Sequence, residues 1–258
     1  MKLPEFILAG FQKCGTTAIY NILKKHSGVG VSCANPDTKD PTSDISYSYP
    51  KELNYFQKDS VYNLGVDWYK GHFNTDLPCV DVSPNYLLAS PEKVDLTLSR
   101  IAASGFSGNF IVVIRNPIDR AFSALNHFRQ ELPQSLRWAN WSRKDTFIEN
   151  IKKGTGITVD YNIGINKLIN QFSKDRLTIL VSERLSSGEQ SEYDKLYSAL
   201  GVKPKPFRRI GRGKSHKRDY AYTLSDVQRA QVKELYADKV KQLYELLGYE
   251  IPEWEDFQ

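Results

Sequence analysis

Four short apolar segments, separated by longer stretches with helical periodicity, constrain the fold of this chain more than any other feature. The segments are EFILAG (5–10), LPCVDVS (77–83), GNFIVVIRNP (108–117) and RLTILVSE (176–183). The third is rich in β-branched residues, which favour strands. Strands that alternate with helices indicate βαβ units and a parallel sheet covered by helices on both faces. We therefore predict an α/β fold with three layers, built as a single domain over residues 1–258.

The helical stretches place the remaining elements. They lie directly after the first strand, from Pro117 onward, and around residues 91–103, 144–153, 162–173, 189–200 and 225–247. The last helix carries one apolar stripe, which predicts burial of Val232, Leu235, Tyr236, Val240, Leu243 and Leu247. Two segments do not fit the alternation: a polar insertion at 30–60 and a basic stretch at 203–222. Long loops in a compact domain are usually functional or disordered.

Charge and cysteine content narrow the class of protein. The 258 residues carry a net charge of +5, from 35 basic and 30 acidic side chains, and residues 203–218 hold eight Lys or Arg and no acid. The three cysteines have no metal-ligand spacing, which argues against a disulfide framework or a zinc site. The first residues lack a signal-peptide pattern, and no apolar run approaches a membrane span. We predict a cytoplasmic protein without membrane contact or bound metal.

The segment FQKCGTTAIYNIL (11–23) joins the first strand to a helix. Free backbone N–H groups and the helix dipole make such a junction an anion site. Lys13 supplies a positive charge, Gly15 permits close approach, and Thr16 and Thr17 add hydroxyl donors. The sequence therefore predicts a phosphate- or sulfate-binding loop, with an ordinary tight turn as the alternative.

The loop is not a Walker motif, G-x-x-x-x-G-K-[ST]. Gly10 and Gly15 have the motif's spacing, but Thr16 stands where its lysine belongs. Asp81, near the end of the second strand, is placed to serve as a Mg²⁺ ligand. A nucleotide or small-molecule kinase with a degenerate loop therefore remains an alternative.

A second anion site is predicted after the third strand. Arg115 lies just beyond the strand's carboxyl end, where ligands bind in open α/β sheets, and Ser123 follows about two helical turns later. Arginine suits a terminal phosphate through bidentate hydrogen bonds. The alternative is an arginine that caps a neighbouring helix.

Together these residues match a family. FQKCGTTAIYNIL and IRNPIDRAFSALNHF (114–128) resemble the two phosphoadenosine-binding motifs of sulfotransferases that use 3′-phosphoadenosine 5′-phosphosulfate (PAPS). The likeness is greatest to the glycosaminoglycan branch, the heparan sulfate N- and O-sulfotransferases. The segments KELNYF, GVDWY, DVSPNYL, GKSHKRDY and LLGYEIPEW follow in the family's order, so the resemblance covers nearly the whole chain. It implies a P-loop-like fold, PAPS as donor, adenosine 3′,5′-bisphosphate (PAP) as product and no metal.

The resemblance also implies how the donor is held. The 5′-phosphosulfate would bind Lys13, Cys14, Gly15, Thr16 and Thr17, and the 3′-phosphate would bind Arg115 and Ser123. A basic loop would close over the nucleotide through Ser215, His216, Lys217 and Arg218. The family's lysine–glycine pair reads here as His216–Lys217, which leaves the register of this loop open by one or two residues.

Three residues are candidates for the chemistry, an in-line displacement at sulfur. Lys13 would stabilise charge on the bridging oxygen. Glu52, in KELNYF, matches the family's glutamate base, which takes the acceptor's proton; without the resemblance, an exposed loop glutamate is the favoured alternative. His127 shares a helix face with Ser123 and would act as acid, base or sulfate-binding donor, or be a partly exposed histidine without such a role. The related pattern has a lysine where this chain has Val82, which leaves the acceptor class open.

The sequence thus predicts sulfuryl transfer to a hydroxyl or amine of a small molecule, natural product or sugar. The acceptor pocket would be shaped by residues 30–60 and 132–160, with Trp138, Trp141 and Tyr161 as walls that stack against a ring or sugar or, alternatively, as core residues. A nucleic-acid binder is disfavoured because only Phe207 and Tyr220 accompany the basic stretch. The oligomeric state is left open.

Overall fold

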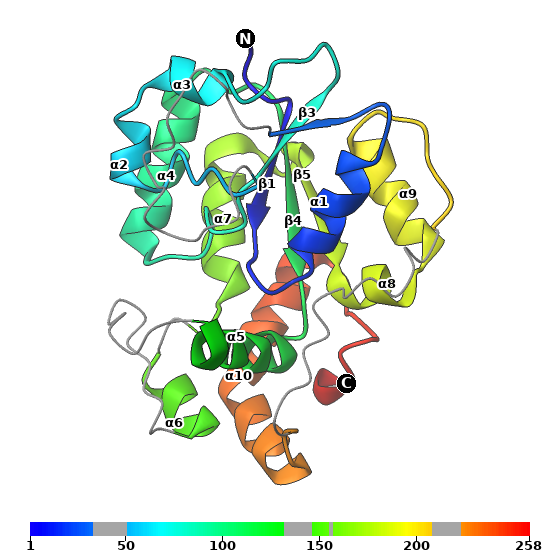
Figure 1. Ribbon diagram of the computed structural model, residues 1–258. Coiled ribbons are helices and arrows are strands. Elements are labelled where there is room, and N and C mark those ends of the chain that lie inside the picture. Colours follow the sequence, from blue (N-terminus) through cyan, green and yellow to red (C-terminus); the bar gives the residue numbers. More distant parts are fainter. Residues whose placement is uncertain (33–50, 132–145, 155–156, 208–222) are drawn as a thin grey trace. The chain divides into compact units, whose positions relative to one another are not determined.

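A computed structural model describes residues 1–32, 51–131, 146–154, 157–207 and 223–258 (Figure 1). Its contacts divide the chain into two compact units. The first unit comprises Met1–Ile114 and Ile163–Arg209, and the second comprises Arg115–Asn162 and Ile210–Gln258. The expectation of one domain over residues 1–258 stays a prediction.

A five-stranded parallel sheet forms the centre of the first unit. Its strand order is β2-β3-β1-β4-β5, and every neighbouring pair is parallel. The strands are β1 (Phe6–Gly10), β2 (Gly30–Val31), β3 (Cys79–Val82), β4 (Asn109–Ile114) and β5 (Leu177–Val181). The four apolar segments form β1, β3, β4 and β5, and β2 is a two-residue addition at the edge. The predicted α/β class with a parallel sheet is confirmed.

Helices cover both faces of this sheet, which gives three layers (Figure 1). One face carries α1 (Thr16–Lys24), α8 (Ser182–Ser187) and α9 (Gln190–Ala199). The other carries α4 (Pro91–Ala103) and α7 (Tyr161–Phe172), with the short helices α2 (Asp59–Tyr62) and α3 (Val66–Lys70) beside α4. A 3₁₀ turn, η2 (Lys174–Arg176), leads into β5.

The start of β4 requires a glycine. Asn109 N donates to Glu5 O at 2.9 Å, which brings the chain before β4 against the chain before β1. A Cβ at Gly108 would stand 2.0 Å from Glu5 O, well inside van der Waals contact. This close approach aligns the two central strands, whose carboxyl ends carry the loops described below.

The second unit is helical. It contains α5 (Pro117–Glu131), α6 (Phe147–Lys152), α10 (Asp226–Leu247) and the 3₁₀ turn η3 (Glu255–Phe257), and α10 packs against the other three. A capping box between Ser225 and Gln228 begins α10, and Gly248 in the left-handed conformation ends it. None of the helices in the described part of the chain is long and apolar enough to cross a membrane.

The predicted stripe of α10 is correct at four positions and wrong at two. Val232, Tyr236, Val240 and Leu243 are buried, as the spacing of about four residues requires. Leu235 is 40% exposed because it lies one residue, about 100° of rotation, away from Tyr236. Leu247, the last residue of the helix, is only half-buried.

Candidate active site

The turn between β1 and α1, with the first residues of α1, is called here the anion loop (residues 11–17). Phe11 N donates to Val113 O at 3.1 Å, which fixes the start of the loop to β4. Lys13 and Gly15 have positive φ angles of 70° and 88°. A side chain at Gly15 would be strained in this left-handed conformation, so the tight entry into α1 explains the glycine.

The N-terminus of α1 has no side-chain cap, as is also true of α2, α3, α8 and α9. The helices α4, α6 and α10 begin at Ser90, Thr146 and Ser225, whose hydroxyls accept a backbone N–H of the first turn. The N-cap of α1 is Gly15, which offers no side-chain acceptor. The first-turn N–H groups of α1 and its positive dipole end are therefore suited to an anion.

The predicted loop residues contribute in different ways. Lys13 and Thr17 are half-buried, so their side chains remain accessible to a ligand. The Cys14 side chain is fully buried, which leaves only its backbone to face a bound group. Thr16 is buried at the first position of α1. The loop therefore combines one ammonium group, backbone N–H groups and the Thr17 hydroxyl.

Lys51, which the sequence analysis did not identify, connects this loop to Glu52. Its Nζ donates to Thr17 Oγ1 at 2.8 Å and to Glu52 Oε1 at 2.7 Å. Both charged side chains are largely buried, with 9% of Lys51 and 13% of Glu52 exposed. Within the first unit, the Lys51 ammonium group therefore links Glu52, the predicted base, to the anion loop, which is predicted to bind the sulfuryl donor.

The segment that carries Glu52 is held from β3. Asn54 N donates to Ser83 Oγ at 3.1 Å, and Asn54 Nδ2 donates to the backbone oxygen of Glu52 at 3.1 Å. Asn54 has a φ of 50°, a conformation that asparagine tolerates better than most residues. Ser83 Oγ in turn donates to Asp81 Oδ1 at 2.7 Å. A chain of hydrogen bonds therefore runs from β3 to the turn that follows Glu52.

Asp81 is fully buried and serves as an internal acceptor. Its Oδ2 accepts hydrogen bonds from the hydroxyls of Tyr69 and Tyr86, each at 2.8 Å, and its Oδ1 accepts from Ser83. Burial raises the pKa of Asp81, and the hydrogen bonds from Ser83, Tyr86 and Tyr69 offset part of that rise. A carboxylate engaged in this way is poorly placed to bind Mg²⁺, which disfavours the kinase alternative.

Ser182 is a second residue that the sequence analysis missed. It directly follows β5, and its Oγ lies 3.5 Å from the position that a Cβ on Gly15 would occupy. The hydroxyl therefore borders the anion loop. The available signal was its place after the fourth apolar segment, because ligands bind beyond the carboxyl ends of parallel strands.

The second unit holds the other predicted ligands. Arg115 is half-buried directly after β4, and Ser123 is buried on α5. His127, one helical turn after Ser123, is half-buried. The side chain that caps α5 is Asn116, whose Oδ1 accepts from Ile118 N at 3.0 Å.

The structure thus groups the candidates in two sets. Lys13, Cys14, Gly15, Thr16 and Thr17 lie together with Glu52 in the first unit, and Arg115, Ser123 and His127 lie in the second. Val82, where the related pattern has a lysine, is buried in β3. Ser215, His216, Lys217 and Arg218 lie outside the described residues, as do Trp138 and Trp141. Tyr161, the third aromatic residue predicted for the acceptor pocket, is instead buried, with its hydroxyl bonded to the main chain of Arg115, which fits a residue of the core.

Comparisons with known proteins identify the family of the chain. The family model described as a sulfotransferase domain matches residues 3–247. The bifunctional heparan sulfate N-deacetylase/N-sulfotransferase 4 of Mus musculus is 26% identical over 216 residues, and the human bifunctional enzyme 3 is 25% identical over 216 residues. These matches cover 78% and 79% of this chain but 23% of each relative, so the chain corresponds to about a quarter of their length.

Solved structures show the same fold. A sulfotransferase from Alicyclobacillus acidocaldarius superposes with a TM-score of 0.68 at 16% identity, covering 99% of this chain and all of the other. A sulfotransferase domain from the curacin biosynthetic pathway gives a TM-score of 0.57 at 17% identity, covering 98% of this chain and all of the other. The predicted P-loop-like three-layer architecture is therefore confirmed.

Proposed function

The chain belongs to the sulfotransferase family, and from this premise we propose that it transfers the sulfuryl group of PAPS to a hydroxyl or amine of a small-molecule or carbohydrate acceptor. The observation that carries the proposal lies in the first unit. An N-terminus of α1 without a side-chain cap, flanked by Lys13, is connected through Lys51 to the carboxylate of Glu52. An anion site and a general base joined in this way are what in-line transfer to a protic acceptor requires.

The anion loop binds the 5′-phosphosulfate in this proposal. Backbone N–H groups at the start of α1 and the ammonium of Lys13 face its oxygens, and the dipole of α1 favours their charge. Thr17 Oγ1 accepts the hydrogen bond from Lys51, so the Thr17 hydroxyl can donate its own hydrogen bond to the phosphosulfate of PAPS. A donor without a triphosphate needs no Mg²⁺ cradle, which explains why the loop departs from the Walker pattern.

During transfer, the acceptor oxygen or nitrogen forms a bond to sulfur while the bond between sulfur and the bridging oxygen breaks. The leaving phosphate keeps the electron pair of that bond, and Lys13 stabilises the charge that develops there. Glu52 takes the proton of the acceptor. Its Oε1 is held by Lys51, which leaves Oε2 to receive that proton.

The second unit contributes the recognition of the nucleotide. Arg115 and Ser123 bind the 3′-phosphate, which distinguishes PAPS and PAP from 5′-nucleotides. His127, on the same helix, contacts the transferred group or the acceptor. Ser215, His216, Lys217 and Arg218 cover the nucleotide.

The names of the relatives indicate which class of acceptor to test first. Their names describe N-sulfotransferases of heparan sulfate, a polysaccharide, so an amino sugar is the first acceptor to test. A paired assay with labelled PAPS would compare a glucosamine oligosaccharide bearing a free amine with its N-acetylated form. Label on the free-amine substrate alone indicates N-sulfation, and equal label on both indicates a hydroxyl.

Donor binding provides the direct test of the proposal. We expect PAP to raise the thermal midpoint of the protein in the presence of a chelator, because a ligand that binds only the folded state stabilises it. Mg-ATP is the comparison ligand for the kinase alternative, and an oligonucleotide is the comparison for nucleic-acid binding. Stabilisation by Mg-ATP but not by PAP would show that the proposal is wrong.

A further inference from the structure

The main chain of Arg115 is fixed on both sides by one tyrosine in the second unit. The Tyr161 hydroxyl accepts a hydrogen bond from Arg115 N at 3.2 Å and donates one to Arg115 O at 2.7 Å. Tyr161 is almost completely buried, and its ring lies 6.3 Å from that of the fully buried Trp254. Tyr161 and Trp254 are too buried to contact a bound nucleotide. Tyr161 instead restrains the backbone of Arg115, the residue proposed to bind the 3′-phosphate.

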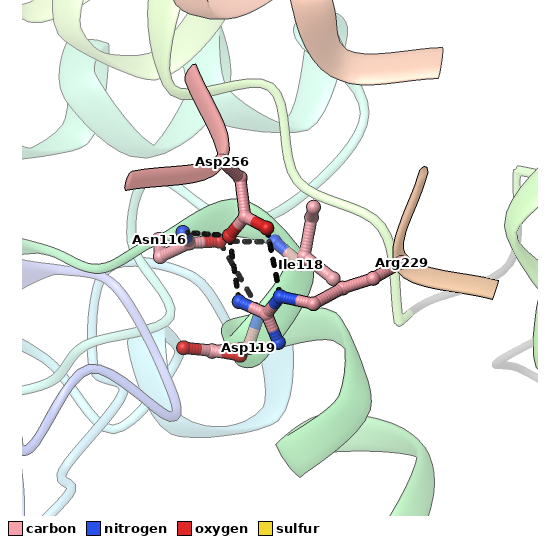
Figure 2. A network of polar contacts seen from close by, with 5 residues as sticks. All are labelled: Asn116, Ile118, Asp119, Arg229 and Asp256. Carbon is pink, nitrogen blue, oxygen red and sulfur yellow. Dashed lines mark hydrogen bonds and ion pairs between the residues drawn. The ribbon is translucent and has the colours of Figure 1, made fainter. Parts of the chain in front are cut away.

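The next residue, Asn116, joins this turn to the end of the chain (Figure 2). Its Oδ1 accepts from Ile118 N and so caps α5, while its Nδ2 donates to Asp256 Oδ2 at 2.7 Å. Asn116 is only 3% exposed. Its amide therefore has one orientation that satisfies both ends: the oxygen toward α5 and the nitrogen toward Asp256.

Arg229, on α10, fixes Asp256 in turn (Figure 2). Its Nε and Nη2 donate to the two oxygens of Asp256 at 2.7 and 2.6 Å, and its Nη1 donates to Asp119 Oδ1 at 2.8 Å. The two parallel bonds form the bidentate arrangement that gives an arginine–carboxylate pair its directional specificity. We call Asn116, Asp119, Arg229 and Asp256 the Asp256 network.

We propose that Asp256 and Arg229 are positioning residues for recognition of the donor's 3′-phosphate. They hold Asn116, and Asn116 together with Tyr161 holds the turn from which the Arg115 side chain extends. The inference rests on the proposed function, because it assigns the 3′-phosphate to Arg115. The match to the family model ends at residue 247, so Asp256 lies in the C-terminal segment that the family model does not match.

The network has two possible consequences that a binding experiment separates. If it only stabilises the packing of α5, α10 and the C-terminal turn, its loss weakens every ligand equally. If it positions Arg115, its loss weakens ligands that carry a 3′-phosphate and spares those that lack one. PAP and adenosine 5′-monophosphate form this matched pair, because they differ by the 3′-phosphate alone.

The experiment measures both ligands by calorimetry on the wild type, Asp256→Asn and Arg229→Lys. Asparagine keeps the shape of Asp256 but loses its charge, and lysine keeps the charge of Arg229 but loses the bidentate fork. We expect the Kd of PAP to rise about 10-fold in Asp256→Asn, in line with about 1.4 kcal/mol per factor of ten. The Kd of adenosine 5′-monophosphate should stay within about twofold by the same scale, and Arg229→Lys should lie between.

Lys239→Met is the matched control. Lys239 is also on α10 and forms an ion pair with Asp160 at 3.6 Å, outside the Asp256 network. We expect it to leave the affinities for both ligands unchanged. Equal losses for the two ligands, or no loss for PAP in either network variant, would overturn the inference. A wild type that does not prefer PAP would instead overturn the assignment of the 3′-phosphate to Arg115, and with it both proposals.

Discussion

Replacement of Lys51 by methionine tests the link between the anion loop and Glu52. Methionine preserves an unbranched apolar stem but removes the ammonium that donates to Thr17 Oγ1 and Glu52 Oε1. The Glu52 carboxylate then stays in a largely buried place without its countercharge. We expect the variant to lose stability, and to lose turnover because Glu52 is no longer oriented.

The structure sets the expected size of the stability loss. Removing one member of a buried ion pair costs about 3–5 kcal/mol, whereas exposed pairs contribute about 0.2–1 kcal/mol. With 9% and 13% of the two side chains exposed, the Lys51–Glu52 pair lies near the buried limit. We therefore expect a loss of about 3 kcal/mol for Lys51→Met. In Lys51→Met/Glu52→Gln, the loss should be about 2 kcal/mol smaller than the sum of the single losses, because the uncompensated charge is gone.

Urea denaturation of the single and double variants measures these losses, with Lys167→Met as the matched control. Lys167 Nζ lies 2.6 Å from Asp95 Oδ2 in the same unit, but the two side chains are 28% and 57% exposed. The Lys167–Asp95 pair therefore has a bond length comparable to that of the Lys51–Glu52 pair but is less buried. Lys167→Met should lower the free energy of unfolding by less than about 1 kcal/mol. Equal losses for Lys51→Met and Lys167→Met, or simple additivity of the Lys51 and Glu52 changes, would refute the reasoning.

The other predictions concern turnover, packing and pH. Lys13→Ala should abolish turnover in the labelled-donor assay because charge on the leaving oxygen loses its stabilisation, whereas Lys25→Ala, at the exposed end of α1, should not. Glu52→Gln should lower the rate by about 10²–10⁴ while PAP affinity measured by calorimetry persists; weaker PAP binding with normal turnover would contradict the assignment of the base. Asp81→Asn should destabilise the protein to urea by about 2–4 kcal/mol, because an amide cannot accept all three hydrogen bonds at this buried site, and an unchanged midpoint would contradict that role. Burial raises the pKa of Asp256, but hydrogen bonds from Arg229 and Asn116 and the charge of Arg229 hold it below its usual value. Its contribution to stability is therefore present above the unfolded pKa of about 3.9 and lost as pH falls through the folded pKa. The stability difference between wild type and Asp256→Asn should accordingly shrink between pH 7 and pH 3, and a constant difference would contradict the assignment.

The sequence predicts those features whose physical cause lies within a few consecutive residues. The segments that became β1, β3 and β4 are buried apart from Asn109, and nearly every residue in them is hydrophobic. The edge strand β5 is half-buried over its first three residues and buried over its last two, and it is also mostly apolar. The anion loop is likewise local, because a strand, a glycine in the left-handed conformation and a helix N-terminus follow one another in the chain. The edge strand β2 has only two residues, too few for a periodic signal.

The features that the sequence does not reveal depend on contacts between distant residues. In KELNYF, the adjacent Lys51 and Glu52 look like a solvated pair of opposite charges. Only the fold places Lys51 against Thr17, 34 residues earlier, and buries it there. Asp256 similarly occurs among the acidic residues of a C-terminal segment, and its role appears only when the fold brings it to Asn116, 140 residues away. Short motifs predict the groups that we propose to touch a ligand, but they do not reveal the residues that orient those groups.

This difference explains how the two proposed anion sites are built. The anion loop obtains its shape from backbone geometry, so glycine at position 15 and the helix dipole suffice to form it. Arg115 follows a strand without such a turn, and a long flexible side chain must be held by its surroundings before it can discriminate a phosphate at one position. Tyr161 and the Asp256 network supply that restraint on its backbone and on the neighbouring residue. Changes in the network should therefore alter the selectivity for a 3′-phosphate, while changes in the loop should alter the transfer of the sulfuryl group itself.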